Sequence, residues 1–131
     1  MFLYDSDQQF IINVAENIIV KCYVYYITQA IDNLVSNAVK YGEGKPITIS
    51  LEKTVNNKVK FTIMDQGIGI PKDELISIFH KFTTSSKTRT PAGGRGIGLA
   101  LCEKVITVHG GNIEAQSDGK KGASFSFVLP C

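Results

Sequence analysis

The chain has 131 residues, of which 44% are hydrophobic and 20% charged, and its 14 Lys and Arg against 12 Asp and Glu give a formal net charge of +2. This length and apolar fraction predict one globular domain over 1–131 and exclude intrinsic disorder. The near balance of charge argues against a protein that binds nucleic acid through bulk electrostatic attraction.

Membrane spans and secretory signals are also disfavoured. No apolar run approaches the roughly 18 residues that a membrane span needs. The first twenty residues hold three acidic and no basic residues, whereas a secretory signal begins with a basic region. We therefore expect a cytoplasmic chain without direct membrane contact. Its cysteines have no CxxC spacing and are expected to be reduced thiols, namely Cys22, Cys102 and Cys131.

The first third of the chain predicts a strand and a long helix. The longest apolar runs, such as Phe10–Val14, have the length of a strand. Apolar residues recur at helical spacing over 29–41, and Gly42 and Gly44 follow as stop signals. The start of this helix is left open, because 23–26 offers no side chain that commonly caps a helix.

The middle of the chain predicts a hairpin, a short helix and a loop. Apolar and polar residues alternate over 47–51 and 59–63, on either side of Asn56 and Asn57, which is typical of an antiparallel hairpin. A short amphipathic helix is expected after Pro71, and 83–96 lacks periodicity, as a loop does.

The last third of the chain predicts one more helix and two closing strands. Helical spacing returns over 97–109 and is ended by two glycines, and 113–116 and 123–129 alternate like strands. The fold class is therefore α/β, with helices on one face of an antiparallel or mixed sheet.

One face of the first helix carries amide side chains. Gln29, Asn33, Asn37 and Lys40 lie on the same side, away from the apolar residues. Amide oxygens are neutral ligands suited to a hard cation such as Mg²⁺, and a lysine can attract phosphate. An ordinary solvated face is the alternative, and the stripe taken alone favours it.

Two glycine-rich segments could approach a ligand closely. In the first, Asp65 can accept a hydrogen bond from an exocyclic amine while Gly67 and Gly69 let the backbone approach a flat ligand, although a tight turn capped by the Asp explains the same spacing. The second places four glycines within 93–98, just before a helix, and backbone N–H groups at a helix start can hold a polyphosphate. Residues 75–102 contain basic and no acidic side chains, which suits an anion.

In this order, the motifs resemble the ATP-binding catalytic domain of sensor histidine kinases, within the superfamily of gyrase, the ninety-kilodalton heat-shock chaperone and MutL. The matching segments are an asparagine box (33–41), a first glycine box (65–69), a phenylalanine box (78–82) and a second glycine box (94–99). The resemblance implies a two-layer α/β sandwich, the Bergerat fold. Its mixed, largely antiparallel sheet would have about five strands, covered by about three helices.

The resemblance also implies roles for individual residues. Asn37 would ligate Mg²⁺ with help from Asn33, and Lys40 would meet the phosphates, so Asn33 and Lys40 are the catalytic candidates. Tyr41 would pack beside the adenine or ribose, and Asp65 would accept the adenine amino group. The other candidates for binding ATP are Gly67, Gly69, Phe82, Lys87, Arg89, Arg95, Gly96, Gly98 and Leu99.

The residue before the metal ligand bears on mechanism. In ATP-hydrolysing relatives a Glu one turn before the Mg²⁺-binding Asn activates water, but here Asn33 stands there and cannot take a proton. The resemblance therefore implies slow hydrolysis and transfer of the γ-phosphoryl group to a histidine on a separate dimerisation domain, which indirectly serves a response regulator.

The residues before the asparagine box contain no His. In the family that the motifs resemble, the acceptor His lies on a hairpin before the ATP domain, and dimerisation resides mainly in that hairpin. The resemblance therefore implies a monomeric fragment that lacks the phosphoacceptor hairpin, and a parent that could be membrane-anchored. His109 is expected to be structural. The sequence departs from the family at Tyr23, where Asp is frequent, at His80 and at Arg95.

Two alternatives stay open at this point. One is a non-catalytic nucleotide-binding regulatory module that keeps the fold and has lost transfer. The other is a serine kinase of the anti-sigma-factor type, which usually keeps an acidic residue at the position of Asn33.

Overall fold

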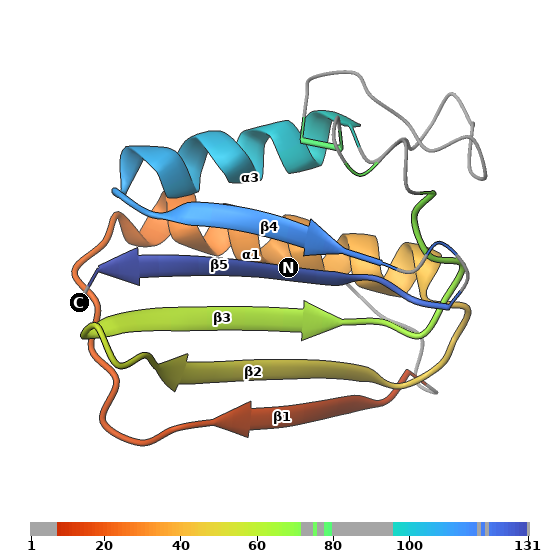
Figure 1. The fold of residues 1–131 in the computed structure, drawn as a ribbon, viewed down its shortest axis with the longest axis horizontal. Helices are drawn as coiled ribbons and strands as arrows, with labels where there is room; N and C mark the ends of the chain where they lie inside the picture. The colour runs from red at the N-terminus through yellow and green to blue at the C-terminus, as the bar shows by residue number, and fades with distance from the viewer. Residues whose placement is uncertain are drawn as a thin grey trace.

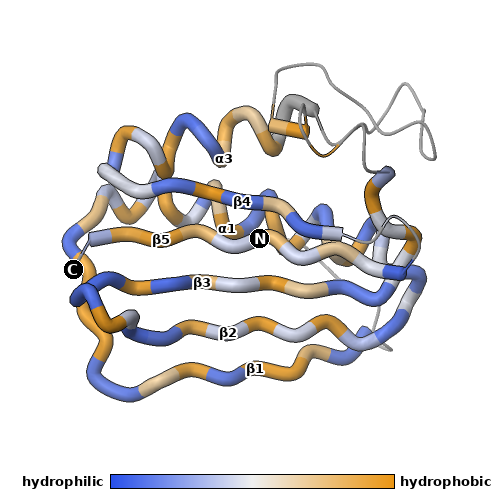
Figure 2. Tube along the Cα trace, viewed as in Figure 1, coloured by the Kyte–Doolittle hydropathy of each residue, from blue (hydrophilic) through white to orange (hydrophobic). Residues whose placement is uncertain are grey.

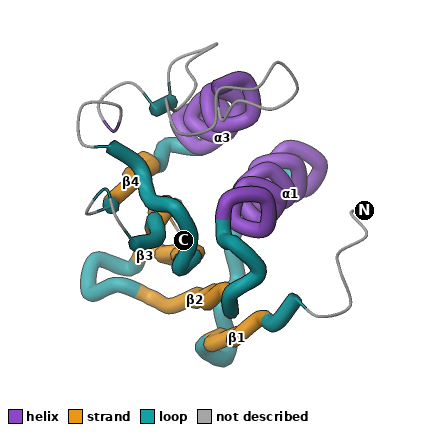
Figure 3. The backbone as a smooth tube through the Cα atoms, turned by 90° about the vertical axis from the view of Figure 1, so that its right-hand side faces the viewer, coloured by secondary structure: helices purple, strands orange, loops and turns teal. Residues whose placement is uncertain are grey.

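A computed structural model describes residues 8–71, 75, 78–79, 96–117, 119 and 121–130. In this part of the chain, two helices lie on one face of a five-stranded sheet (Figures 1 and 3). In chain order the elements are β1 (Phe10–Val14), α1 (Val24–Tyr41), β2 (Ile47–Lys53), β3 (Lys58–Met64), α3 (Gly96–Val108), β4 (Asn112–Gln116) and β5 (Ser124–Pro130).

The sheet is mixed and largely antiparallel, with strand order β1-β2-β3-β5-β4. β1 and β2 run parallel, with Phe10 opposite Ile47, and α1 is the crossover that parallel neighbours require. The other three pairs are antiparallel. The expected α/β fold class is therefore confirmed.

The predicted hairpin joins β2 to β3. Asn57 adopts a positive φ of 58°, which Asn tolerates better than most residues. The Thr54 hydroxyl oxygen accepts hydrogen bonds from the N–H groups of Asn56 and Lys58, at 3.3 Å each. The turn thus fixes the register in which Ile49 lies opposite Ile63.

The core lies between the sheet and the helices. In β3 and β5 buried apolar residues alternate with more exposed ones. Figure 2 shows hydrophobic and more hydrophilic residues along these strands. The rings of Phe61 and Phe127 stack with centroids 4.9 Å apart. The inward face of the sheet meets buried residues of both helices, which include Ala30, Leu34, Ala38, Leu99, Cys102, Val105 and Ile106.

The helices agree with the sequence apart from their ends. α1 begins at Val24, earlier than the periodic residues alone indicate, and its N-cap Tyr23 makes no side-chain capping bond. Of the short helix expected after Pro71 the structure describes Leu75, Ile78 and Phe79, of which Ile78 is buried in the core. The third expected helix thus lies mostly outside the described residues. Within the described ranges, none of the helices has the length and apolarity that crossing a bilayer requires.

Candidate functional site

The predicted motifs meet at one end of the molecule. α1 and β3 end there, α3 begins there, and the turn between β4 and β5 lies beside them (Figure 1). Antiparallel packing of α1 and α3 produces this arrangement. The Tyr23 N–H before α1 lies 3.0 Å from Nε2 of His109 after α3, and further along α1 the Ala30 carbonyl oxygen lies 3.3 Å from the Cys102 thiol. The asparagine box therefore ends close to the start of the second glycine box.

Asn37 is a polar residue that is buried at this end of the molecule. The residue is only 8% exposed, and its Nδ2 has no hydrogen-bond partner within the described part of the chain. A buried amide without a partner costs about 1–3 kcal/mol. The solvated-face alternative is therefore wrong for this residue, and a hydrogen-bond acceptor such as a phosphate oxygen would pair the Nδ2 donor and offset the cost.

The two neighbours of Asn37 on the predicted stripe lie in different surroundings. Asn33, one turn earlier, is partly buried, and its side chain hydrogen-bonds with the Cys102 thiol of α3. Lys40 is exposed at the end of α1, where its Nζ lies 5.6 Å from the centroid of the Tyr41 ring. Asn33 therefore links α1 to α3, whereas the ammonium of Lys40 is accessible to an anion.

Asp65 is held at the end of β3 by backbone donors. It is 6% exposed, and its Oδ1 accepts hydrogen bonds from the N–H groups of Gly67 at 2.9 Å and of Ala123 at 3.2 Å. The capped-turn alternative is thus realised, and the same bonds fix the carboxylate in one orientation. A fixed, buried carboxylate can select a ligand that donates a hydrogen bond.

The first glycine box packs directly on the end of α1. The N–H of Ile68 donates to the Tyr41 carbonyl oxygen at 3.2 Å, and Tyr41 itself is buried. A Cβ at Gly67 would collide with that same carbonyl oxygen. Gly69 takes a positive φ of 75°, which glycine adopts without strain. Both glycines thus have conformational reasons to be glycine that are independent of any ligand.

Sequence reasoning missed the contribution of the turn between β4 and β5. The N–H of Gly122 donates to the Gly67 carbonyl oxygen at 2.8 Å, and a Cβ at Gly122 would collide with the Asp65 carbonyl oxygen. The Ser117 hydroxyl donates to the Gly122 carbonyl oxygen at 2.7 Å and accepts from the N–H of Ile70 at 2.9 Å. The only sequence signal was a Ser- and Gly-containing turn, which is common between strands.

The second glycine box opens α3, as predicted. Gly96 is the first residue of the helix and Gly98 follows in its first turn. A helix start leaves backbone N–H groups without intrahelical partners, and these can bind phosphate. Leu99 lies in the core and is 1% exposed, so its side chain anchors the helix start. The candidates Phe82, Lys87, Arg89 and Arg95 lie outside the described residues.

The donor set restricts which cation could bind here. In the described ranges, no group of three His, Cys, Asp or Glu side chains could hold a metal ion. An amide oxygen combined with phosphate oxygens and water is a set that Mg²⁺ accepts and that transition metals favour less. The residues present therefore fit Mg²⁺ bound together with a polyphosphate.

Comparisons with known proteins identify the family. Residues 24–131 match the family of histidine kinase-, DNA gyrase B- and HSP90-like ATPases, and the chain belongs to it. The sensor histidine kinase WalK of Bacillus subtilis (strain 168) is 40% identical over 107 residues, which are 79% of this chain and 18% of that protein. The sensor protein kinase WalK of Staphylococcus aureus is 37% identical over 108 residues, 80% of this chain and 26% of that protein.

A solved structure supports the same fold. The mycobacterial sensor histidine kinase MprB superposes with a TM-score of 0.84 at 28% identity, over 95% of this chain and 84% of that one. The two-layer α/β architecture is therefore that of a histidine kinase ATPase domain. The chain spans only a minor part of the length of the curated relatives.

Proposed function

We propose that this chain binds Mg²⁺-ATP and acts as the catalytic domain of a two-component sensor histidine kinase. The observation that carries the proposal is the buried Asn37 amide, whose Nδ2 lacks a partner among the described residues, at the end of the molecule where Asp65 and the start of α3 also lie. Family membership supplies the expectation that this end holds a nucleotide.

Each residue would contribute a distinct contact. Asn37, assisted by Asn33, would ligate Mg²⁺ through its amide oxygen, while its Nδ2 would donate to a phosphate oxygen. Mg²⁺ when bound would neutralise part of the charge on the phosphates. Lys40 would attract the phosphates, and the N–H groups from Gly96 and Gly98 onward would donate hydrogen bonds to them. Asp65 would accept a hydrogen bond from the adenine amino group, and Tyr41 with Gly67 and Gly69 would shape the base pocket.

The reaction would be transfer of the γ-phosphoryl group to a histidine on a dimerisation domain of the same kinase. An imidazole nitrogen attacks the γ-phosphorus, the bond from that phosphorus to the bridging oxygen breaks, and ADP leaves. Asn33 cannot accept a proton, so water would compete poorly as the nucleophile. This domain would contribute position and charge stabilisation rather than acid–base catalysis.

The test is phosphoryl transfer in trans. The chain is mixed with γ-labelled Mg²⁺-ATP and a purified dimerisation domain that carries an acceptor histidine. We expect a label on that domain that is acid-labile and base-stable, lost when the acceptor is replaced by Gln. Asn37→Ala should abolish labelling, whereas Asn112→Ala, an exposed Asn on β4, should not. ATP binding without any label would favour the regulatory module, and an acid-stable label would favour a serine kinase.

A further inference from the structure

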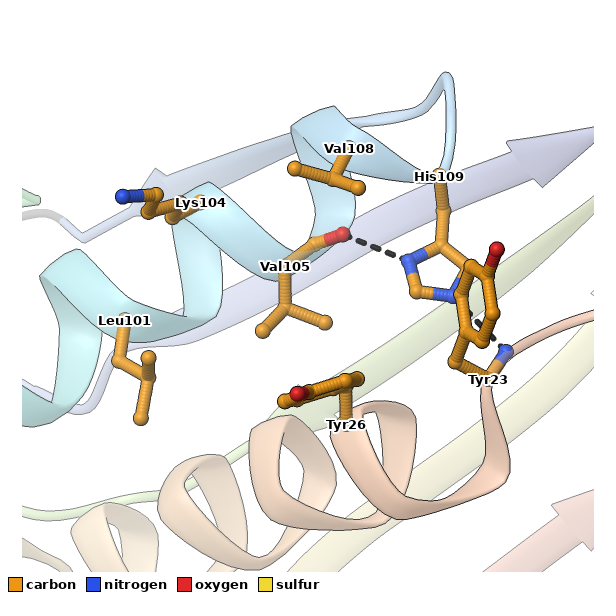
Figure 4. A pocket seen from close by; sticks show the side chains of 7 residues that line it. All are labelled: Tyr23, Tyr26, Leu101, Lys104, Val105, Val108 and His109. Carbon is orange, nitrogen blue, oxygen red and sulfur yellow. Dashed lines mark hydrogen bonds between the residues drawn. The ribbon is translucent and has the colours of Figure 1, made fainter.

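A contact at the opposite end of the helices ties the start of α1 to the end of α3. The backbone N–H of Tyr23 donates to Nε2 of His109 at 3.0 Å, across a separation of 86 residues in the sequence. Nδ1 of the same ring lies 2.7 Å from the Val105 carbonyl oxygen (Figure 4). The Tyr23 and His109 rings also meet edge to face, with centroids 5.5 Å apart.

The contact replaces a cap that α1 lacks. Tyr23 is the N-cap of α1 and makes no side-chain capping bond, and no acidic residue stands in the first turn. In a capping box, the side chain at the third helical position accepts the N–H of the N-cap residue. Here that position is Tyr26, and the acceptor comes instead from His109. His109 is therefore structural, as the sequence predicts. From the end of α3 it accepts the N–H of the N-cap residue of α1.

Both hydrogen bonds together specify the protonation state of the ring. A carbonyl oxygen only accepts, so Nδ1 carries the hydrogen and donates to Val105, while Nε2 must keep its lone pair to accept from Tyr23. An imidazolium has a hydrogen on both nitrogens and cannot accept the Tyr23 N–H. The contact therefore requires a neutral ring.

The surroundings offer no compensation for a protonated ring. His109 lies in a groove of about 340 Å³ between the two helices, whose other lining residues are Tyr23, Tyr26, Leu101, Lys104, Val105 and Val108 (Figure 4). Among the lining residues that the structure describes, Lys104 alone is charged, and it is a cation. On the β5 side, Pro130 lies beside Gly110 and adds no charge. Among these described neighbours, no carboxylate faces the ring.

We propose that His109 is a proton-sensitive clasp between α1 and α3, closed while its ring is neutral and opened when the ring is protonated. Protonation of the ring removes the acceptor of the Tyr23 N–H, so the protonated ring would open the clasp. The two helices it joins carry Asn37 and the second glycine box at their other ends. The clasp thus gives the fold a response to pH that does not depend on the proposed kinase function.

The test is nuclear magnetic resonance of the whole chain between about pH 5 and 8, within the range in which imidazoles titrate. The ring protons of His109 and the amide of Tyr23 are followed in the same samples. We expect the two signals to change with one midpoint. Amide exchange at Tyr23, corrected for its intrinsic pH dependence, should be at least about fivefold slower in the closed state, the factor that corresponds to one hydrogen bond.

His109→Gln is the matched variant, because its amide oxygen can accept the Tyr23 N–H but does not titrate. We expect this variant to keep the slow exchange at every pH. A Tyr23 amide that is unchanged while the His109 ring titrates would overturn the proposal. So would the same pH response in His109→Gln, because His80 is then the only histidine in the chain.

Discussion

Asn37 and Lys40 lie one turn apart at the end of α1 but are exposed to very different degrees. Lys40 is in contact with solvent, whereas Asn37 is 8% exposed and its amide nitrogen has no partner within the described part of the chain. Native proteins seldom leave a buried polar group unpaired, and each such group calls for an explanation, such as a bound ion or a catalytic role. At the scale of single residues, this amide is therefore the strongest structural sign of a binding site.

Asp65 provides a prediction about base selectivity. In Asp65→Asn, the amide oxygen can still accept the N–H groups of Gly67 and Ala123, but the other carboxylate oxygen is replaced by an NH₂ donor. An adenine amino group would then meet a donor. We expect ATP affinity to fall at least about tenfold, or roughly 1.4 kcal/mol, with thermal stability nearly unchanged.

Titration calorimetry and thermal unfolding check this prediction. Glu114→Gln, an exposed carboxylate on β4, is the matched control and should bind ATP like the unaltered chain. Equal affinities for Asp65→Asn and the control would show that Asp65 serves only the turn.

Cys102 provides a prediction about pH. Burial raises the pKa of its thiol from 9.0 to about 12, an effect that a hydrogen bond with Asn33 only partly opposes. The thiolate is the reactive form, so at about pH 8 we expect iodoacetamide to alkylate the less buried Cys22 at least about a hundred times faster than Cys102. Peptide mapping by mass spectrometry measures both rates, and unfolding in guanidinium should make them similar.

The same shift has a defined sign for stability. Because the folded-state pKa is the higher one, the stabilisation is intact below pH 9.0 and is lost as the pH rises towards about 12. The free energy of unfolding should therefore fall over this interval, and Cys102→Ala should show a smaller fall. A Cys102 that is alkylated as fast as Cys22 in the folded chain would contradict this account.

At the scale of elements, the candidate site depends on three backbone segments packed without side chains between them. The end of α1, the first glycine box and the turn before β5 are joined by the bonds from Ile68 to Tyr41 and from Gly122 to Gly67. Glycine at positions 67 and 122 allows this close approach. The junction holds Asp65 close to the end of the helix that carries Asn37.

Gly67→Ala tests the junction. Its added Cβ would collide with the Tyr41 carbonyl oxygen and lie 2.7 Å from the Gly42 Cα. Both are backbone atoms, which no side-chain rotation can move away. We expect a loss of at least about 2 kcal/mol in the free energy of unfolding, measured by chemical denaturation. Gly44→Ala is the control: Gly44 has a positive φ of 73° but no atom within 4 Å of the added Cβ. It should lose only about 1 kcal/mol, and equal losses would contradict the packing argument.

At the scale of the whole molecule, local sequence patterns predicted the helices and strands, whereas the way these elements pair depends on long-range contacts. The alternation over 47–51 and 59–63 and the periodicity over 29–41 depend on neighbours in sequence, so these elements could be predicted. The pairing of β1 with β2 and the bond between Tyr23 and His109 join distant segments, so no local pattern reveals them.

The candidate site was likewise predictable where it depends on residue type and not where it depends on long-range packing. The glycine boxes and the amide stripe could be located by residue type, and the start of α3 at Gly96 agrees with them. The burial of Asn37 could not be predicted, because the stripe taken alone favours a solvated face. The contributions of Ser117 and Gly122 depend on how the turn before β5 meets β3, which only the folded chain shows.

Titration calorimetry of ATP into the chain, with Mg²⁺ and with the metal chelated, tests the central claim most directly. We predict binding in the presence of Mg²⁺, weakened at least about tenfold by chelation and by Asn37→Ala, but unchanged in Asn112→Ala. No heat of binding in the unaltered chain under either condition, or equal affinity in Asn37→Ala, would contradict the assignment of this end of the molecule as a Mg²⁺-ATP site.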